Sequence, residues 1–540
     1  MRKKLLSVLL VGSLLSTGLL AGCGKQEVST SSEPKETNVS SEVATTTTEA
    51  QKEELEPYTV TWWFGGDESK DHDMVMEKVN ERLAELLPNT ELEIVMVASA
   101  EVQDRWSKAM ATGEKIDLIW SCNWSASGVN PYTAVEQEAL LPMTDWLEQY
   151  GQEMIEGIGG DRVMELHRYN DGEFYFFPSY QGLAAKRSGA YLREDVVALM
   201  PDGWLEKAQE TAFEHTGYTV EDLNARFDLL EEYMEVAEAN DMLGLGLNTN
   251  NWEAYLVNGI GITHNIEWLG VVEEDGVFTV YNRFLDDVHQ VYNKRMQEWY
   301  EKGWIREDIA SAEIQNNDTY CLQVKGAVET DWLEVEKTRR VGQGFTWETT
   351  GFLLNPLTKM SHGFNTGTVM CYTSENPDRA MQVLSLVNTD PELYNLIVFG
   401  IEGTHYLTNA DGTITRPASD ARTYAGISNW KVGNCVNSLI EAGSDINTYK
   451  NKLQQDKEGG VNILANFILD NSEIATEAAN ISAVYAEYGD WLTIAENDFD
   501  YSTLESKLKE AGWDKWQEAV VAQIEEFVSS RNLGTVVVAE

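Results

Sequence analysis

The stretch that decides the fold is YTVTWWF, residues 58–64, which is closed by Gly65 and Gly66. Its β-branched and aromatic residues predict a short strand, and the paired glycines predict the loop that ends it. Hydrophobic spacing further along predicts, in order, a helix over 74–87, a strand over 92–97, a helix over 102–110 and a strand over 116–120. This β-α-β-α-β order is typical of an α/β protein whose parallel sheet is covered by helices.

In open α/β sheets, ligands bind beyond the carboxyl ends of the strands, so the residues that end each strand are the candidate ligand contacts. Aromatic faces bind sugars and organic cations, and neighbouring carboxylates and amides supply hydrogen bonds to hydroxyl groups. Four clusters combine both kinds of side chain: Trp62-Trp63-Phe64 with Asp67, Asn123-Trp124, Asn251-Trp252 and Asp331-Trp332. We expect the residues from Trp62 to Phe64 to follow the first strand and Trp120 to end the third.

Composition excludes several classes of protein. The chain has 540 residues, with 40 basic against 89 acidic side chains and a net charge of −49. A polyanion such as nucleic acid, or an anionic membrane surface, is repelled by such a field. Apolar residues make up 43% of the chain, as in ordinary soluble proteins, and its length predicts two or three packed units. The 17 tryptophans point to a neutral or cationic ligand held by aromatic faces.

The N-terminus predicts export. A basic segment, Arg2 to Lys4, precedes an apolar stretch that ends in Leu-Ala-Gly-Cys at residues 20–23. This ending resembles a bacterial lipobox, which implies cleavage after residue 22 and lipid attachment to Cys23. The alternatives are a plain secretory signal or an N-terminal transmembrane anchor. Residues 23–57 are rich in Ser, Thr and Glu and predict a disordered tether.

No motif for catalysis, a metal or a cofactor is present. The sequence has no P-loop, no dinucleotide-binding fingerprint, no H-E-x-x-H and no G-x-S-x-G. Its histidines are scattered, and the internal cysteines lack metal-ligand spacing: Cys122, Cys321, Cys371 and Cys435. Those four form disulfides or stay as buried thiols. We therefore predict no catalytic residue, no metal and no cofactor.

Further elements are predicted from turn signals and periodicity. They are a hairpin over 271–280, a helix over 288–299, a strand over 326–332, a helix starting at 374–377 and a helical hairpin over 504–527 broken at Gly512.

These features in order resemble an extracellular solute-binding lipoprotein of a bacterial ABC importer, of the family 1 type and an oligosaccharide-permease subgroup. The motifs that carry the resemblance span about 58–530: the lipobox, residues 58–63, 113–120, 140–147, 171–178, 363–380, 401–406 and 430–434. The segment 171–178 resembles the first hinge crossing, and 363–380 the return crossing with its helix.

The resemblance implies a two-lobed periplasmic-binding-protein-like α/β fold with a hinge and a ligand cleft between lobes. Lobe 1 would comprise 58–175 with about 360–430, and lobe 2 about 176–359 with 431–540, including C-terminal helices. The predicted ligand contacts are Trp63, Phe64, Asp67, Asn123, Trp124, Tyr180, Trp252, Asp331, Trp332 and Asn365.

The function implied is capture of a solute, predicted to be an oligosaccharide, and its delivery to permease transmembrane subunits. We expect a monomer that is held at the outer face of the cytoplasmic membrane by the lipid on Cys23 and binds no nucleic acid. Two alternatives remain open from the residues alone. A surface glycoside hydrolase would need two carboxylates about 5–10 Å apart, and a binder of cationic peptides or polyamines would suit the negative charge.

Overall fold

The computed structural model describes residues 55–183, 189–215, 219–244, 247, 268–309, 321–325, 347–348, 359–360, 365–461, 464–488 and 500–539. The predicted signal segment, Cys23 and most of the tether lie outside these residues, as do Trp252, Asp331, Trp332 and the predicted strand 326–332. Within the described ranges, no helix has the length and apolar character needed to span a membrane.

The first body is built on a five-stranded sheet in the order β2-β1-β3-β11-β4. Its strands are β1 (Tyr58–Gly65), β2 (Thr90–Val97), β3 (Leu118–Cys122), β4 (Phe176–Pro178) and β11 (Thr366–Met370). β1 pairs in parallel with β2 and β3, as the β-α-β-α-β order predicted. β11 runs antiparallel to β3 and β4, so the sheet is mixed and only its first three strands match the predicted parallel sheet.

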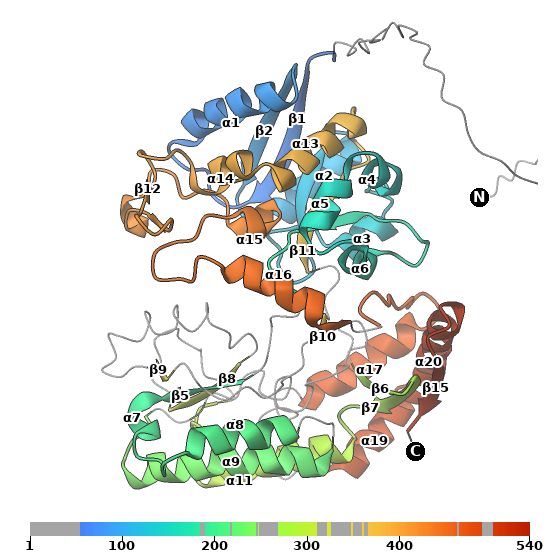
Figure 1. Cartoon of the computed structure of the whole chain (residues 1–540). Coiled ribbons are helices and arrows are strands. Elements are labelled where there is room, and N and C mark those ends of the chain that lie inside the picture. The colour runs from blue at the N-terminus through green and yellow to red at the C-terminus, as the bar shows by residue number, and fades with distance from the viewer. Residues whose placement is uncertain are drawn as a thin grey trace, which may run out of the picture. The chain divides into compact units, whose positions relative to one another are not determined.

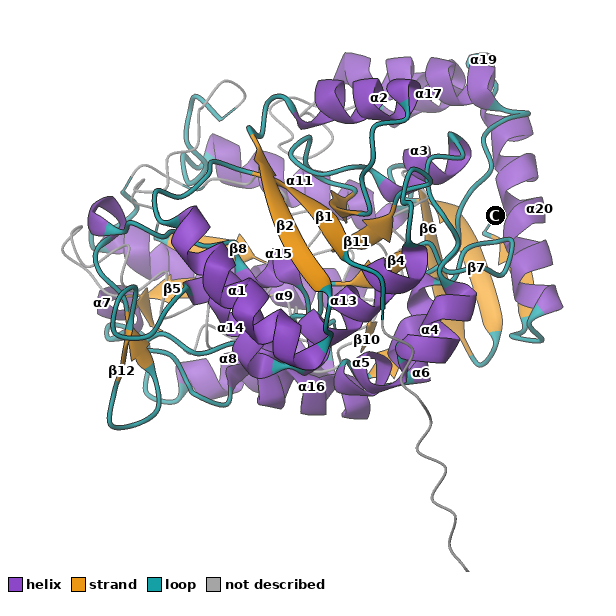
Figure 2. Cartoon of the chain, turned by 90° about the horizontal axis from the view of Figure 1, so that it is seen from above, coloured by secondary structure: helices purple, strands orange, loops and turns teal. Residues whose placement is uncertain are grey.

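Helices cover both faces of this sheet (Figure 2). On one face, Trp62 and Phe64 of β1 pack in a core with α1 (His72–Leu86), α13 (Pro377–Thr389) and α14 (Pro391–Phe399). On the other face, Trp63 packs with α2 (Val102–Thr112) and α3 (Pro131–Glu136). Successive side chains of a strand point to opposite faces, and both faces of β1 are covered from Trp62 to Phe64, where three large aromatic residues follow one another.

The remaining elements of this body are short. They are α4 (Thr144–Tyr150), α5 (Gln152–Gly157), α6 (Asp161–Met164), η1 (Glu165–His167), β12 (Leu407–Thr408), β13 (Ile414–Thr415), η3 (Ser419–Ala421), α15 (Asn429–Val432), η4 (Cys435–Asn437) and α16 (Thr448–Glu458). β10 (Lys359–Met360) pairs in parallel with β14 (Gly460–Val461).

A second core contains three long helices that lie side by side (Figure 1). They are α8 (Trp204–Glu214), α9 (Val220–Ala239) and α11 (Asp287–Glu301), and they pack with α7 (Glu194–Val197) and with a sheet of β8 (Leu322–Lys325), β5 (Gly189–Arg193) and β9 (Trp347–Glu348). α9 begins where the Thr219 hydroxyl accepts a hydrogen bond of 3.1 Å from the Asp222 N–H, a side-chain N-cap.

A third core joins the predicted hairpin to the C-terminal helices. The hairpin is β6 (Leu269–Glu274) and β7 (Val277–Asn282), and β15 (Thr535–Val538) adds a parallel strand to β7. The helices are α17 (Ala475–Tyr488), α19 (Tyr501–Glu510) and α20 (Trp513–Ser530). Asp275 and Gly276 both adopt positive φ, as a two-residue hairpin turn requires, and Gly512 separates α19 from α20 with φ 97°.

One boundary prediction needs correction. β1 continues to Gly65, so Trp62, Trp63 and Phe64 lie inside the strand, and these three large residues are buried instead of exposed at its end. Segment 171–178 ends in β4, an edge strand of the first sheet. The first core also extends past residue 430, because Val432 is buried in it and Leu439 and Leu453 pack against it.

Cys122, Cys321, Cys371 and Cys435 are free and buried. The sequence left open whether these four cysteines form disulfides or stay as thiols. In the structure they are thiols, which pack as small apolar side chains. Burial raises the pKa of the Cys321 and Cys435 thiols to about 12.

Candidate ligand-binding site

Three tryptophans meet at the carboxyl ends of β1 and β3. The ring centroids of Trp120 and Trp124 are 6.2 Å apart, those of Trp120 and Trp430 are 5.7 Å apart, and those of Trp124 and Trp430 are 5.8 Å apart. Trp120 is fully buried, whereas 56% of Trp124 is exposed and Trp430 is half-buried. We call these three rings the tryptophan platform. Trp124 and Trp430 keep ring surface exposed at the edge where open α/β sheets bind ligands.

Hydrogen bonds orient the two rings that flank the sheet. The Nε1 of Trp120 donates to the hydroxyl of Thr366 at 2.9 Å, and the Nε1 of Trp124 donates to the backbone oxygen of Asn365 at 2.9 Å. Both acceptors lie where β11 begins. Because β11 is antiparallel to β3, its first residues stand beside the last residues of β3. The return of the chain through β11 therefore fixes the orientation of Trp124.

The loop that carries Trp124 packs tightly against the strand ends. A Cβ on Gly65 would lie 2.0 Å from the backbone oxygen of Ser127, and a Cβ on Gly128 would lie 2.8 Å from the ring of Trp120. Neither distance leaves room for a side chain. The glycines at these two positions are thus needed for close approach of the loop to β1 and β3.

Lys431 places a cation beneath the platform. Its Nζ lies 4.3 Å from the ring centroid of Trp120 and 5.4 Å from that of Trp430, and it donates a hydrogen bond of 3.0 Å to the Gly65 carbonyl. Burial lowers the pKa of this ammonium group from its ordinary value. Contacts with ring faces and with the end of β1 show that Lys431 ties α15 to the sheet.

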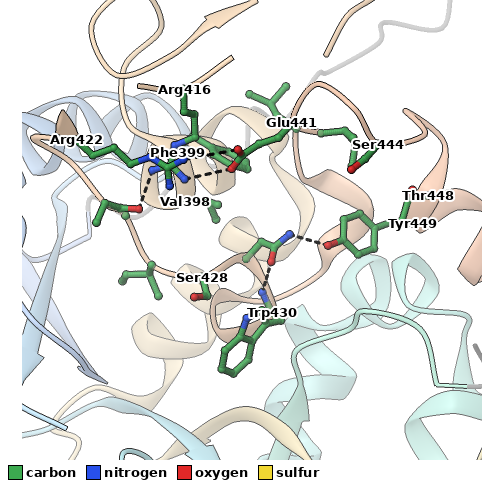
Figure 3. Close-up of a pocket in the computed structure, with 16 residues that line it drawn as sticks. Val398, Phe399, Arg416, Arg422, Ser428, Trp430, Glu441, Ser444, Thr448 and Tyr449 are labelled. Carbon is green, nitrogen blue, oxygen red and sulfur yellow. Dashed lines mark hydrogen bonds and ion pairs between the residues drawn. The ribbon is translucent and has the colours of Figure 1, made fainter. Parts of the chain in front are cut away.

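Trp430 also lines a pocket of about 480 Å³ in the first body (Figure 3). Its charged lining consists of Arg416, Arg422 and Glu441. On its other side, the Asn429 Nδ2 donates to the Tyr449 hydroxyl at 2.8 Å, and the Trp430 N–H donates to the Asn429 Oδ1 at 2.8 Å. Pockets of this size, between roughly 300 and 1,000 Å³, are typical for small molecules.

The structure separates the predicted ligand contacts into three groups. Asp67, Asn123 and Trp124 are exposed at the carboxyl ends of β1 and β3, and Asn365 lies at the start of β11. Trp252, Asp331 and Trp332 lie outside the described residues. The last group is buried and consists of Trp63, Phe64 and Tyr180.

The three buried residues have structural contacts. Trp63 is 3% exposed in the core on the α2 face, with the Arg105 guanidinium carbon 4.6 Å from its ring centroid. Phe64 packs against Trp62 with centroids 5.1 Å apart. The Tyr180 hydroxyl donates a hydrogen bond of 2.5 Å to the Asp456 carboxylate. Each is accounted for by packing within the first body, so none is offered to a solute in this structure.

Sequence reasoning missed Trp430 as a site residue, although a signal was present. The pair Asn429-Trp430 repeats the amide–aromatic pattern that singled out Asn123-Trp124. The sequence predicts no strand before this pair, and Trp430 enters the prediction only within segment 430–434 of the family resemblance. Among the described residues there is no group of three or more His, Cys, Asp or Glu side chains arranged to hold a metal ion.

The fold is that of two-domain solute-binding proteins. The N-glycan transport solute binding protein of Streptococcus pneumoniae matches with a TM-score of 0.66 at 16% identity, covering 88% of this chain and 100% of that one. The same protein solved in complex with Man1GlcNAc matches with a TM-score of 0.58 at 16% identity, covering 87% and 99%. An HMO-binding, ABC-transporter-associated solute binding protein of Bifidobacterium longum infantis matches with a TM-score of 0.57 at 12% identity, covering 88% of this chain and 99% of that one.

Sequence comparison points to the same class. The carbohydrate ABC transporter substrate-binding protein of Streptococcus pneumoniae serotype 4 (strain TIGR4) is 20% identical over 485 residues, which are 86% of this chain and 90% of that protein. A family model described as a domain of unknown function, DUF3502, matches residues 463–529. These findings confirm the resemblance to substrate-binding proteins of ABC importers and the two-lobed α/β fold predicted from the sequence.

Proposed function

We propose that this protein is the substrate-binding component of an ABC importer, which captures an extracellular oligosaccharide and delivers it to a membrane permease. The observation that carries the proposal is the tryptophan platform, where Trp124 and Trp430 present ring faces at the carboxyl edge of the sheet. Indole faces bury the C–H faces of sugar rings, and the exposed Asn123 and Asp67 supply hydrogen-bonding groups at the same edge.

Binding in this proposal requires no catalytic residue. A solute that binds the closed arrangement of two lobes more tightly than the open one shifts the population toward closure. The printed names of the relatives, which include a carbohydrate substrate-binding protein and an N-glycan transport protein, support a saccharide as the solute. The lobe boundaries, the permease partner and a monomeric state remain part of the proposal.

The test is a thermal-shift screen of the purified protein against neutral oligosaccharides, basic peptides and spermidine, with chromatography of each saccharide after incubation. We expect one or more oligosaccharides to raise the melting temperature and to be recovered intact. Cleavage of a saccharide would instead support a glycoside hydrolase. A shift with spermidine or basic peptides and none with sugars would support the cation binder.

We also propose that the mature protein is anchored through a lipid on Cys23 at the outer face of the cytoplasmic membrane. The sequence Leu20-Ala-Gly-Cys23 after a basic and apolar segment supports this location. Metabolic labelling with an alkyne fatty acid should mark the wild-type protein, whereas Cys23→Ala should be unlabelled. Labelling of Cys23→Ala at the wild-type level would contradict the anchor.

A further inference from the structure

The pocket behind Trp430 has a charge balance opposite to that of the whole chain. Two guanidinium groups, from Arg416 and Arg422, share one carboxylate, Glu441, and the other lining residues are uncharged. The lining thus carries one net positive charge in a protein whose net charge is −49. A local excess of arginine in so acidic a chain points to an anionic group as the occupant.

The ion pairs that link these side chains are long. Glu441 lies 3.6 Å from a terminal nitrogen of Arg416 and 3.8 Å from one of Arg422, beyond ordinary hydrogen-bond length. Figure 3 shows both guanidinium groups converging on the Glu441 carboxylate. One shared carboxylate at these distances compensates two buried or half-buried cations only in part, because both attractions are weakened by distance.

Within the described residues, three backbone oxygens accept hydrogen bonds from the two guanidinium groups of the pocket. Arg416 donates through one terminal nitrogen to the backbone oxygens of Tyr424 at 3.2 Å and Ala425 at 2.8 Å, and Arg422 donates through Nε to Pro417 at 2.9 Å. Within the described part of the chain, the Nε of Arg416 is buried without a hydrogen-bond partner, and only 7% of this side chain is exposed. A guanidinium has five N–H donors in a planar fork that matches a carboxylate.

The rest of the lining suits a sugar ring. Hydroxyl and amide groups come from Ser428, Asn429, Ser444, Thr448 and Tyr449, and Trp430 contributes the edge shared with the tryptophan platform. Arg422 and Glu441 remain partly exposed, with 26% and 47% of their side chains accessible, so a solute can reach them. The pocket therefore combines a carboxylate-binding fork with hydroxyl-binding groups.

We propose that this pocket binds the carboxylate of a sugar acid, so that the imported solute includes an acidic sugar unit held beside the tryptophan platform. The part of this inference that concerns the imported solute rests on the proposed function. Binding of a sugar acid to the pocket itself can be measured independently of any oligosaccharide.

The experiment is calorimetric titration of the purified protein with sodium glucuronate, with glucose and the uncharged glucuronamide as controls. We expect glucuronate to bind, with an affinity that falls as salt rises, and both controls to bind at least tenfold more weakly. Equal binding of glucuronate and glucuronamide, or binding of neither, would overturn the inference.

Two variants with opposite charge effects make the test independent of folding. Arg422→Gln removes a pocket cation and should weaken glucuronate binding by about tenfold to a hundredfold. Glu441→Gln removes the competing carboxylate and should strengthen it. A fall or no change with Glu441→Gln, or an unchanged affinity in Arg422→Gln, would show that the pocket charges do not recognise the carboxylate.

The same titrations separate this inference from the proposed function. If neutral oligosaccharides bind and glucuronate does not, the pocket assignment is wrong and the substrate-binding role stands. If glucuronate binds in the charge-dependent way and no oligosaccharide binds, the pocket assignment stands and the oligosaccharide role fails. Arg416 is left unchanged because it also holds the carbonyls of Tyr424 and Ala425.

Discussion

The indole Nε1 of Trp124 donates a hydrogen bond of 2.9 Å to the backbone oxygen of Asn365, a residue 241 positions away in the sequence. This bond holds a ring that is more than half exposed, with its centroid 5.8 Å from that of Trp430. An exposed aromatic ring with a fixed orientation loses little conformational entropy when a solute packs on it. The relationship explains how a surface tryptophan can serve as a binding face.

Trp124→Ala should weaken oligosaccharide binding by about tenfold, because losing about 1.4 kcal/mol of apolar burial between the sugar and the ring is a tenfold change in affinity. The free energy of unfolding should change little, since 56% of this side chain is exposed in the folded state. Calorimetry and urea denaturation measure the two effects separately. Leu407→Ala, which truncates a side chain that is 61% exposed and lies outside the platform, is the matched control and should affect neither. Unchanged affinity in Trp124→Ala would remove the platform from the site.

Trp63→Ala should behave differently, although the sequence placed both tryptophans in one predicted site. Trp63 is 3% exposed, so its removal leaves a cavity and should reduce the free energy of unfolding by about 3–5 kcal/mol. Urea denaturation is the direct measurement. The buried position would be contradicted if Trp63→Ala kept wild-type stability and lost only sugar affinity.

Gly65→Ala should impair binding through the loop that carries Trp124. The added Cβ would lie 2.0 Å from the Ser127 oxygen, so the loop has to move away from the end of β1. We expect a loss of sugar affinity together with a change in tryptophan fluorescence. Gly403→Ala is the control, because its Cβ meets nothing within 4 Å and only its positive φ of 77° adds strain. Unchanged sugar affinity in Gly65→Ala, or an equal loss in Gly403→Ala, would contradict a specific displacement of the loop.

Tyr180→Phe should lower stability without changing ligand affinity. The phenol is fully buried and donates to Asp456, so its loss costs about 1–3 kcal/mol. Burial, together with the neighbouring Asp456 carboxylate, raises the pKa of Tyr180, so this group stays protonated at physiological pH. Urea denaturation measures the stability of the variant, and calorimetry on the same preparation measures its ligand affinity. A selective loss of affinity at wild-type stability would return Tyr180 to the list of ligand contacts.

The ionised Asp500 carboxylate should stabilise the start of α19, and this contribution to the free energy of unfolding should be lost at low pH. Hydrogen bonds from Thr503 and Ser502 lower the pKa of its carboxyl from 3.8 to about 2 in the folded protein. The folded state favours the ionised form, so the stabilisation is fully present above pH 4 and is lost as the pH falls toward 2. The melting temperature of Asp500→Asn should lie below that of the wild type at pH 7, and the difference should shrink near pH 2.5. A difference that is constant with pH would contradict the assignment.

Local sequence patterns predicted the start of the first sheet, the hairpin, one central helix and the C-terminal helices. The first three strands, the two helices between them, the hairpin and the helix break at Gly512 all follow from patterns within about 15 residues. Such patterns are determined by neighbouring residues, which is why they are readable without a structure. The burial of Trp63 and Phe64 was not readable in this way. A strand that is buried on both faces is rich in large apolar residues, and so is an aromatic cluster that follows a strand. Composition alone therefore does not distinguish the two.

The sequence by itself determined the acidic charge and the α/β class, and it predicted aromatic–amide pairs as ligand contacts. Tertiary structure decided which pairs meet. Trp120, Trp124 and Trp430 come together only because β11 returns antiparallel beside β3 and α15 packs over the same edge. Arg416, Arg422 and Glu441 likewise line one pocket although no periodic pattern joins them. Contacts across hundreds of residues depend on chain topology, which hydrophobic periodicity does not encode.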